Sequence, residues 1–142
     1  MNYWLLKSEP SKWAWEEQKK VKKEMWDGVR NYQARNNLMK MKKGDLCFFY
    51  HSVYEKKIVG IVEVLKEYYQ DPTDKTNKFV VVDVGYKKQL EKAVSLEQIK
   101  NKKSLSHLAI IKQSRLSVMP IDKKSWNLII KMSKKNEQNT LD

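Results

Sequence analysis

Three β-rich segments in the middle of the chain constrain its fold more than any other feature. They cover residues 45–52, 57–69 and 78–86, are dense in Val, Ile, Phe and Tyr, and are separated by turn-like segments. This composition and spacing are typical of short β-strands. An antiparallel meander is therefore the simplest topology that joins them. Gly60, inside the second segment, predicts a bulge or a tight bend of a barrel.

Shorter elements are expected on both sides of this meander, from turn signals, helix caps and apolar periodicity. They are a strand over 3–7, helices over 12–20, 32–41 and 95–100, a last strand over 116–120, and an amphipathic helix that follows Asp122. Strands with short helices packed around them in so small a chain predict an α+β domain built on a compact, partly closed barrel. We expect one domain over residues 1–133 and a polar tail over residues 134–142.

Length and composition limit the class of protein. A chain of 142 residues can bury one core, and 41% hydrophobic residues with five tryptophans are too many for a disordered chain. No stretch approaches the roughly 18 apolar residues of a membrane span, so we expect neither a membrane partner nor export. Cys47, the single cysteine, lies in an apolar run and is expected to be buried in a reducing compartment.

These features predict a cytoplasmic protein, including association with the nucleoid. One cysteine also excludes disulfides, zinc fingers and iron–sulfur clusters. No metal and no cofactor is therefore expected.

The charge balance favours polyanionic partners. With 29 basic and 17 acidic residues the net charge is +12, which attracts nucleic acid first and anionic lipid second. Runs of lysine also serve solubility alone, so charge does not decide between these roles. The only arginines are Arg30, Arg35 and Arg115. In a chain so rich in lysine they indicate a need for a planar fork or a stacking plane, although structural salt bridges explain Arg30 and Arg35 nearly as well.

The common catalytic signatures are absent from the sequence. It contains no glycine-rich phosphate loop, no nucleophile elbow and no zinc-deaminase motif. His51 precedes Ser52, but no acid is placed to orient the histidine. We therefore favour hydrogen bonding at a strand end over nucleophilic catalysis for this pair.

One segment, residues 26–36, concentrates groups that suit a flat, hydrogen-bonding ligand. Trp26 offers a stacking face beside a glycine, and Asn31 carries a donor and an acceptor for a base edge. Ser8 and Glu9, at the end of the first expected strand, add further polar groups. A nucleobase fits this description, whereas plain core packing remains the alternative for Trp26 and the interpretation of the other four tryptophans.

Five segments, in the right order, resemble the successive signatures of the EVE-domain family. They cover residues 4–10, 26–36, 49–52, 69–72 and 114–118, and the similarity extends from residue 3 to about residue 132. The resemblance implies a PUA-like pseudo-barrel of mostly antiparallel strands with short flanking helices, related to YTH and ASCH domains. Gln70 stands where the family often has proline, and the segment around Trp13 departs from the usual helix start; both departures concern loop geometry.

The resemblance also implies a pocket for a modified base in DNA or RNA, such as methylated or hydroxymethylated cytosine or methylated adenine. It does not imply catalysis. Carried over to this sequence, the ligand-binding residues are Lys7, Ser8, Glu9, Pro10, Trp26, Asp27, Gly28, Val29, Arg30, Asn31, Tyr50, His51, Ser52, Arg115 and Ser117.

The leading hypothesis is a non-enzymatic reader in which lysines attract the polyanion and the pocket selects the base. Two alternatives stay open. ASCH relatives include hydrolases of modified nucleosides, and here Lys7 would act as base or nucleophile with Glu9 as the acid. A general RNA-binding accessory domain would use only the basic surface and would not discriminate among bases.

Overall fold

A computed structural model describes residues 1–135, and residues 136–142 of the expected tail lie outside the described residues. The centre of the molecule is one six-stranded sheet in the order β2-β5-β4-β3-β1-β6. Its strands are β1 (Tyr3–Ser8), β2 (Glu24–Met25), β3 (Leu46–His51), β4 (Lys57–Gln70), β5 (Val80–Ser95) and β6 (Val118–Ile121).

The pairing confirms the predicted meander and adds one parallel pair. β3, β4 and β5 follow one another in antiparallel order, and β6 is antiparallel to β1. β1 pairs with β3 in parallel, so Ser8 lies beside His51. Parallel neighbours require a crossover connection, which here contains two helices and β2. The ends of β1 and β3 consequently meet at the same edge of the sheet.

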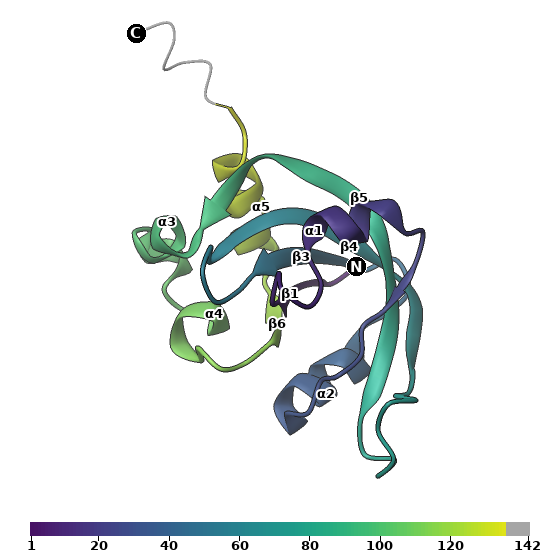
Figure 1. Ribbon diagram of the computed structural model, residues 1–142. Helices are drawn as coiled ribbons and strands as arrows, with labels where there is room; N and C mark the ends of the chain where they lie inside the picture. Colours follow the sequence, from purple (N-terminus) through teal and green to yellow (C-terminus); the bar gives the residue numbers. More distant parts are fainter. Residues whose placement is uncertain (136–142) are drawn as a thin grey trace, which may run out of the picture.

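β5 is much longer than the predicted segment 78–86, and that boundary was wrong. The polar stretch after Gly85 resembles the end of a strand, but it continues to pair with the first half of β4, where Gln89 lies opposite Gly60. Register shifts between Ile58 and Gly60 and at three further places bend the two strands, and the resulting curvature is visible in Figure 1. The bulge predicted at Gly60 is confirmed.

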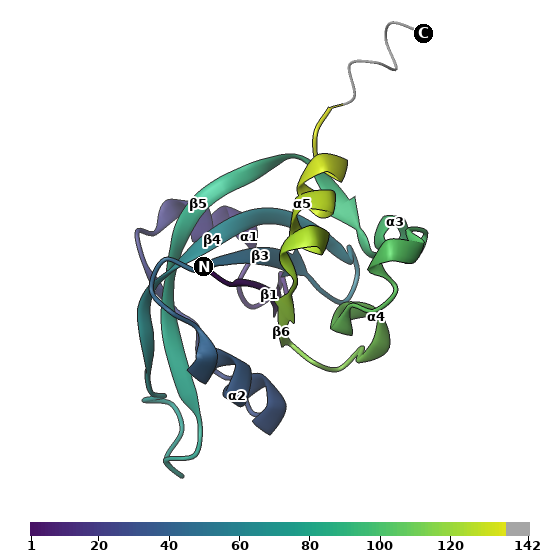
Figure 2. The same cartoon turned by 180° about the vertical axis from the view of Figure 1, so that it is seen from behind.

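Five α-helices and one 3₁₀ helix surround the sheet in the described residues. They are α1 (Trp15–Lys20), α2 (Tyr32–Lys40), α3 (Leu96–Lys100), η1 (Lys103–Leu105), α4 (Ala109–Lys112) and α5 (Lys123–Met132). α1 lies in front of the strands in Figure 1, whereas α5 lies in front in the reverse view of Figure 2, so the two helices cover opposite sides. α2 runs beside the long β4–β5 hairpin in both views.

The predicted helix starts agree with the structure wherever a side chain caps the first turn. Asn31, Ser95 and Asp122 each accept a hydrogen bond from the backbone N–H three residues later. α1 begins at Trp15 rather than at residue 12. The backbone N–H groups of Lys12 and Trp13 donate to the Glu9 carbonyl, and these bonds form a turn there instead of a helix. β2, η1 and α4 were not predicted; each has four residues or fewer and lacks a periodic pattern.

The core lies between the sheet and its covering helices. Phe48 and Phe49 are fully buried although they point to opposite faces of β3, because this central strand is covered on both sides. Trp126 of α5 stacks on Phe48 with ring centroids 3.8 Å apart. Cys47 is buried as predicted, and burial raises the pKa of its thiol far above the ordinary value. The thiol is therefore inert.

No helix within residues 1–135 is long and apolar enough to cross a membrane. No group of three or more His, Cys, Asp or Glu side chains in the same residues is placed to hold a metal ion.

Candidate nucleobase-binding site

A cavity of about 530 Å³ opens where β1 ends, and we call it the Trp26 cavity. Its walls come from the end of β1, the turn that follows, β2, and the loop between β2 and α2. The lining residues are Lys7, Ser8, Glu9, Lys12, Trp13, Glu24, Met25, Trp26, Asp27, Gly28, Val29, Arg30, Asn31 and Ser117.

The structure brings most of the predicted site residues to this cavity and leaves some outside it. Lys7, Ser8, Glu9, the whole segment from Trp26 to Asn31, and Ser117 are in its lining. The remaining predicted residues do not line it: Pro10, Tyr50, His51, Ser52 and Arg115. Arg115 lines a neighbouring cavity instead.

His51, the last residue of β3, and Ser52, which follows it, have supporting roles. His51 is buried; its Nε2 accepts the backbone N–H of Trp15 at 3.0 Å, so the ring proton is on Nδ1, which faces Glu55 at 2.7 Å. Ser52 donates to the carbonyl of Ser8 through both its backbone N–H and its hydroxyl. The hydrogen bonding expected for His51 at a strand end is therefore present, and it holds the start of α1. The expectation that no acid orients the histidine was wrong, because Glu55 does so.

Contacts with the sheet hold Trp26 in place. Its backbone N–H donates to the carbonyl of Val82 at 2.8 Å, and its ring meets Phe49 edge to face at 5.6 Å. Only 8% of Trp26 is exposed, so the residue serves the core and the cavity wall at the same time. Gly28, which lines the cavity, has φ +79°, a left-handed conformation that favours glycine, and this sets the turn of the loop.

Asp71, buried in the turn after β4, fixes this loop to the β4–β5 hairpin. Its carboxylate accepts from the Gly28 backbone N–H at 3.1 Å, from the Arg30 guanidinium at 3.0 Å, and from the backbone and hydroxyl of Thr73. Burial by itself would raise the pKa of Asp71, but these hydrogen bonds outweigh it and hold the pKa below the ordinary value. Asp71 is thus a positioning residue for the cavity.

The structural salt bridge that was the alternative interpretation of Arg30 is therefore present, but it is only part of the role of this residue. Its guanidinium also donates to the Thr73 hydroxyl at 3.0 Å and lies 5.4 Å from the Phe79 ring. The Arg30 side chain nevertheless stays 41% exposed and lines the cavity. Arg35 is not in the lining; it donates to the carbonyl of Lys78 and to the side chain of Asn36.

The polar groups of the cavity suit a ligand with both donors and acceptors. Glu9, Glu24 and Asp27 supply carboxyl groups, and burial followed by repulsion from Asp27 raises the pKa of Glu24. Lys7 donates to the carbonyl of Ser114 at 2.8 Å, and burial lowers its pKa. A carboxyl group accepts from an exocyclic amine of a base, and one with a raised pKa also donates when protonated.

Sequence reasoning missed four lining residues: Lys12, Trp13, Glu24 and Met25. Trp13 was interpreted as core, yet it is only half-buried. The Ser8 hydroxyl donates to the Trp13 carbonyl, and the Trp13 indole donates to Gln18 at 2.8 Å. Glu24 reaches the cavity because β2 pairs with β5, and no local sequence pattern predicts this pairing.

Carboxylates with lowered pKa values predict acid sensitivity of the fold. Hydrogen bonds, mainly one from Thr76, lower the pKa of Asp74 as they lower that of Asp71. At Asp122 burial would raise the pKa, but hydrogen bonds from His107 and Ser125 outweigh burial and bring the pKa to about 2. The unfolded chain then binds more protons than the folded one, so these groups stabilise the fold above about pH 4 and this stability is lost as pH falls toward 2. Thermal unfolding at pH 7, 4 and 2.5 should give midpoints that fall with pH, and a midpoint independent of pH would contradict this.

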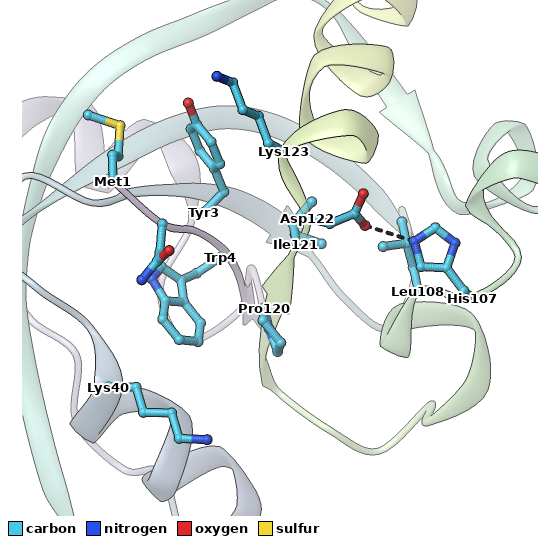
Figure 3. A pocket seen from close by; sticks show the side chains of 11 residues that line it. Met1, Tyr3, Trp4, Lys40, His107, Leu108, Pro120, Ile121, Asp122 and Lys123 are labelled. Carbon is cyan, nitrogen blue, oxygen red and sulfur yellow. Dashed lines mark hydrogen bonds and ion pairs between the residues drawn. The ribbon is translucent and has the colours of Figure 1, made fainter.

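A second cavity, the Tyr3 cavity, lies at the opposite end of β1 and has about 540 Å³ (Figure 3). Its aromatic residues are already engaged: Tyr3 stacks on Trp126, and the Trp4 indole donates to Asp45 at 3.0 Å. Figure 3 shows Asp122 facing His107. An Asp122 carboxylate oxygen lies 2.7 Å from His107 Nε2, and Asp122 also caps α5. None of the predicted site residues lines this cavity, so it is the weaker candidate for a base.

Curated relatives align over most of the chain. Thymocyte nuclear protein 1 of Mus musculus is 34% identical over an alignment that covers 92% of this chain and 73% of that protein. The human protein of the same name is 31% identical and covers 94% of this chain.

Solved structures agree with the fold. An NMR structure of a Rhodopseudomonas palustris protein is 44% identical with a TM-score of 0.89, covering 94% of this chain and 93% of its own. Human THYN1 in complex with DNA that contains 5-methylcytosine is 29% identical with a TM-score of 0.88, covering 96% and 99%.

A more distant likeness concerns the fold alone. The YTH domain of Zygosaccharomyces rouxii MRB1 is 14% identical with a TM-score of 0.57 over 94% of this chain and 87% of its own. The likeness of the two folds agrees with the predicted PUA-like α+β class. Residues 2–132 match the EVE domain, and the chain belongs to the EVE domain family.

Proposed function

We propose that the protein is a non-enzymatic module that binds nucleic acid and recognises one modified base in the Trp26 cavity. The observation that carries the proposal is the cavity itself, in which two tryptophans lie among carboxyl, amide and cationic groups. The human relative whose structure contains 5-methylcytosine DNA supports it. The net charge of +12 supplies affinity for the backbone.

The energetics of this proposal favour modified or unpaired bases. Taking a base out of a duplex costs a few kcal/mol, and stacking on an aromatic ring contributes about 1–3 kcal/mol. One or two hydrogen bonds to the base edge offset the remainder. The carboxyl groups of Glu9, Glu24 and Asp27 favour bases with an exocyclic amine, among them cytosine and adenine.

A titration against matched oligonucleotides tests the proposal. The oligonucleotides differ in one base, which is either unmodified or methylated cytosine or adenine, and each is measured at two salt concentrations. We expect overall affinity to fall with salt, whereas the ratio between modified and unmodified sequences stays constant, because the backbone carries the salt dependence and the cavity carries the preference. If all sequences bind with equal affinity at each salt concentration, the base-reader function is refuted and the general RNA-binding domain remains as the alternative.

The hydrolase alternative retains one favourable observation. The pKa of Lys7 is lowered by burial, and Glu9 lines the same cavity, which is the arrangement that a lysine base with a neighbouring acid requires. Incubation of the protein with modified nucleosides, followed by chromatography, separates the two functions. A reader leaves the nucleosides intact, whereas a hydrolase releases product and loses turnover in Lys7→Ala.

Location and extent complete the proposal. We propose one domain over residues 1–133 and a cytoplasmic site of action, including the nucleoid. The buried single cysteine supports a reducing compartment. The name of the mouse and human relatives favours the nucleus over the cytoplasm for those two proteins.

A further inference from the structure

A small polar cavity of about 300 Å³ adjoins the Trp26 cavity, and we call it the Arg115 cavity. Asn31 lines both cavities. The other lining residues are Gln33 at the start of α2 and the segment 112–116 between α4 and β6. The two cavities are thus neighbouring parts of one surface.

Two contacts hold the second cavity in place beside the first. The ammonium group of Lys7, which lines the Trp26 cavity, donates to the carbonyl of Ser114 at 2.8 Å. Asn37 of α2 donates to the carbonyl of Val118 at 2.7 Å and so joins α2 to the strand that follows the segment. The arrangement of the two cavities is therefore built into the fold.

The two cavities differ in charge. The Trp26 cavity contains three carboxyl groups, whereas no acidic residue lines the Arg115 cavity. Lys112 and Arg115 supply positive charge there, and within residues 1–135 neither is part of an ion pair. Gln33, Gln113 and Ser114 add neutral hydrogen-bond donors. The three carboxyl groups of the Trp26 cavity are matched there by three cationic side chains, whereas the positive charge of the Arg115 cavity has no acidic counterpart in its lining, so an anion is favoured in the second cavity over the first.

We propose that the Arg115 cavity binds a phosphodiester group of the nucleic-acid backbone next to the base held in the Trp26 cavity. The inference rests on the proposed function, because a base and its flanking phosphate belong to one nucleotide unit. Arginine suits this role, since its planar guanidinium donates two parallel hydrogen bonds to phosphate oxygens. Phosphate contacts fix register, so this site would orient the strand while the first cavity reads the base.

The test compares Arg115→Gln with Lys131→Gln, which removes the same charge from an exposed position on α5, away from both cavities. Ligands are a methylated nucleoside, the same nucleoside carrying a phosphate, and an oligonucleotide with that base. We expect the unaltered protein and Lys131→Gln to bind the phosphorylated form about tenfold more tightly than the nucleoside, and Arg115→Gln to lose this advantage without losing nucleoside affinity. On the oligonucleotide, Arg115→Gln should also reduce the salt slope by about one relative to the control.

The outcomes separate this inference from the proposed function. A phosphate advantage and a salt slope that are the same in both variants would overturn the phosphate site, even if the preference for the modified base persists. Conversely, equal binding of modified and unmodified oligonucleotides, together with a salt slope reduced only in Arg115→Gln, would refute the base reader and support the phosphate site.

Discussion

Replacing Trp26 by Ala is expected to abolish the preference for the modified oligonucleotide and to lower the free energy of unfolding by about 3–5 kcal/mol. The residue lines the cavity, is 8% exposed, and packs against Phe49, so the substitution removes both a stacking surface and a large part of the core. Binding that depends on salt but not on the base should remain, because the lysines are untouched. Titration and denaturant unfolding measure the two effects.

Two further variants separate the loss of binding from the loss of stability. Trp126→Ala removes an equally buried tryptophan that lines none of the three cavities, so it should cost similar stability and keep the base preference. Trp13→Ala should cost less stability but lose the base preference, because Trp13 is only half-buried and lines the Trp26 cavity. An unchanged preference in folded Trp26→Ala and Trp13→Ala would exclude this cavity as the base site.

Gly60→Ala is expected to lower the free energy of unfolding by about 1–3 kcal/mol or more, although it adds a single methyl group. That methyl carbon would lie 2.0 Å from the Trp15 ring. The ring has no free space to enter, since Trp15 is 3% exposed and lies between Phe49 and Tyr86, with centroids 5.1 and 5.4 Å away. The strain must therefore move α1, and with it the adjoining Trp13 wall of the cavity.

A double-mutant cycle tests this contact. Trp15→Phe alone should destabilise the protein, but it makes room for the methyl group, so Gly60→Ala should cost less in the Trp15→Phe background. Denaturant unfolding of the four proteins gives the coupling energy. Strictly additive effects would show that the close approach of Trp15 is not the reason for glycine at this position.

Glycine at position 60 illustrates what local sequence information can and cannot predict. Its place inside an alternating apolar segment predicts a bulge, because that expectation depends only on neighbours along the chain. The contact with Trp15 joins residues that are distant in sequence, and no local pattern contains it. The prediction of a bulge was therefore correct, while the packing reason for the glycine was not foreseen.

The strand boundaries show the same division. The apolar runs of β3 and β4 place those strands well, because burial on the sheet imposes their composition. β5 continues through an exposed polar stretch, since its hydrogen bonds to β4 hold it there without apolar side chains. β2 exists only because two residues meet β5, and it carries Glu24 into the cavity.

Among the candidate site residues, local sequence served best where the site is one continuous segment. The loop from Trp26 to Asn31 lines the cavity as a unit, because a left-handed glycine and a helix cap shape it locally. His51 and Arg115 were expected in the same cavity, but the first supports α1 and the second lines the neighbouring cavity.

The sequence by itself determined the α+β class, the meander, the capped helix starts and the segment that forms most of the candidate site, because these follow from periodicity and contacts between near neighbours. The tertiary structure alone decided that Asp71, 43 residues away, anchors Gly28, and that the Trp26 cavity and the Arg115 cavity are separate neighbours. Such features depend on which distant segments the folded sheet brings together, and the information for that lies in the packing of the whole domain.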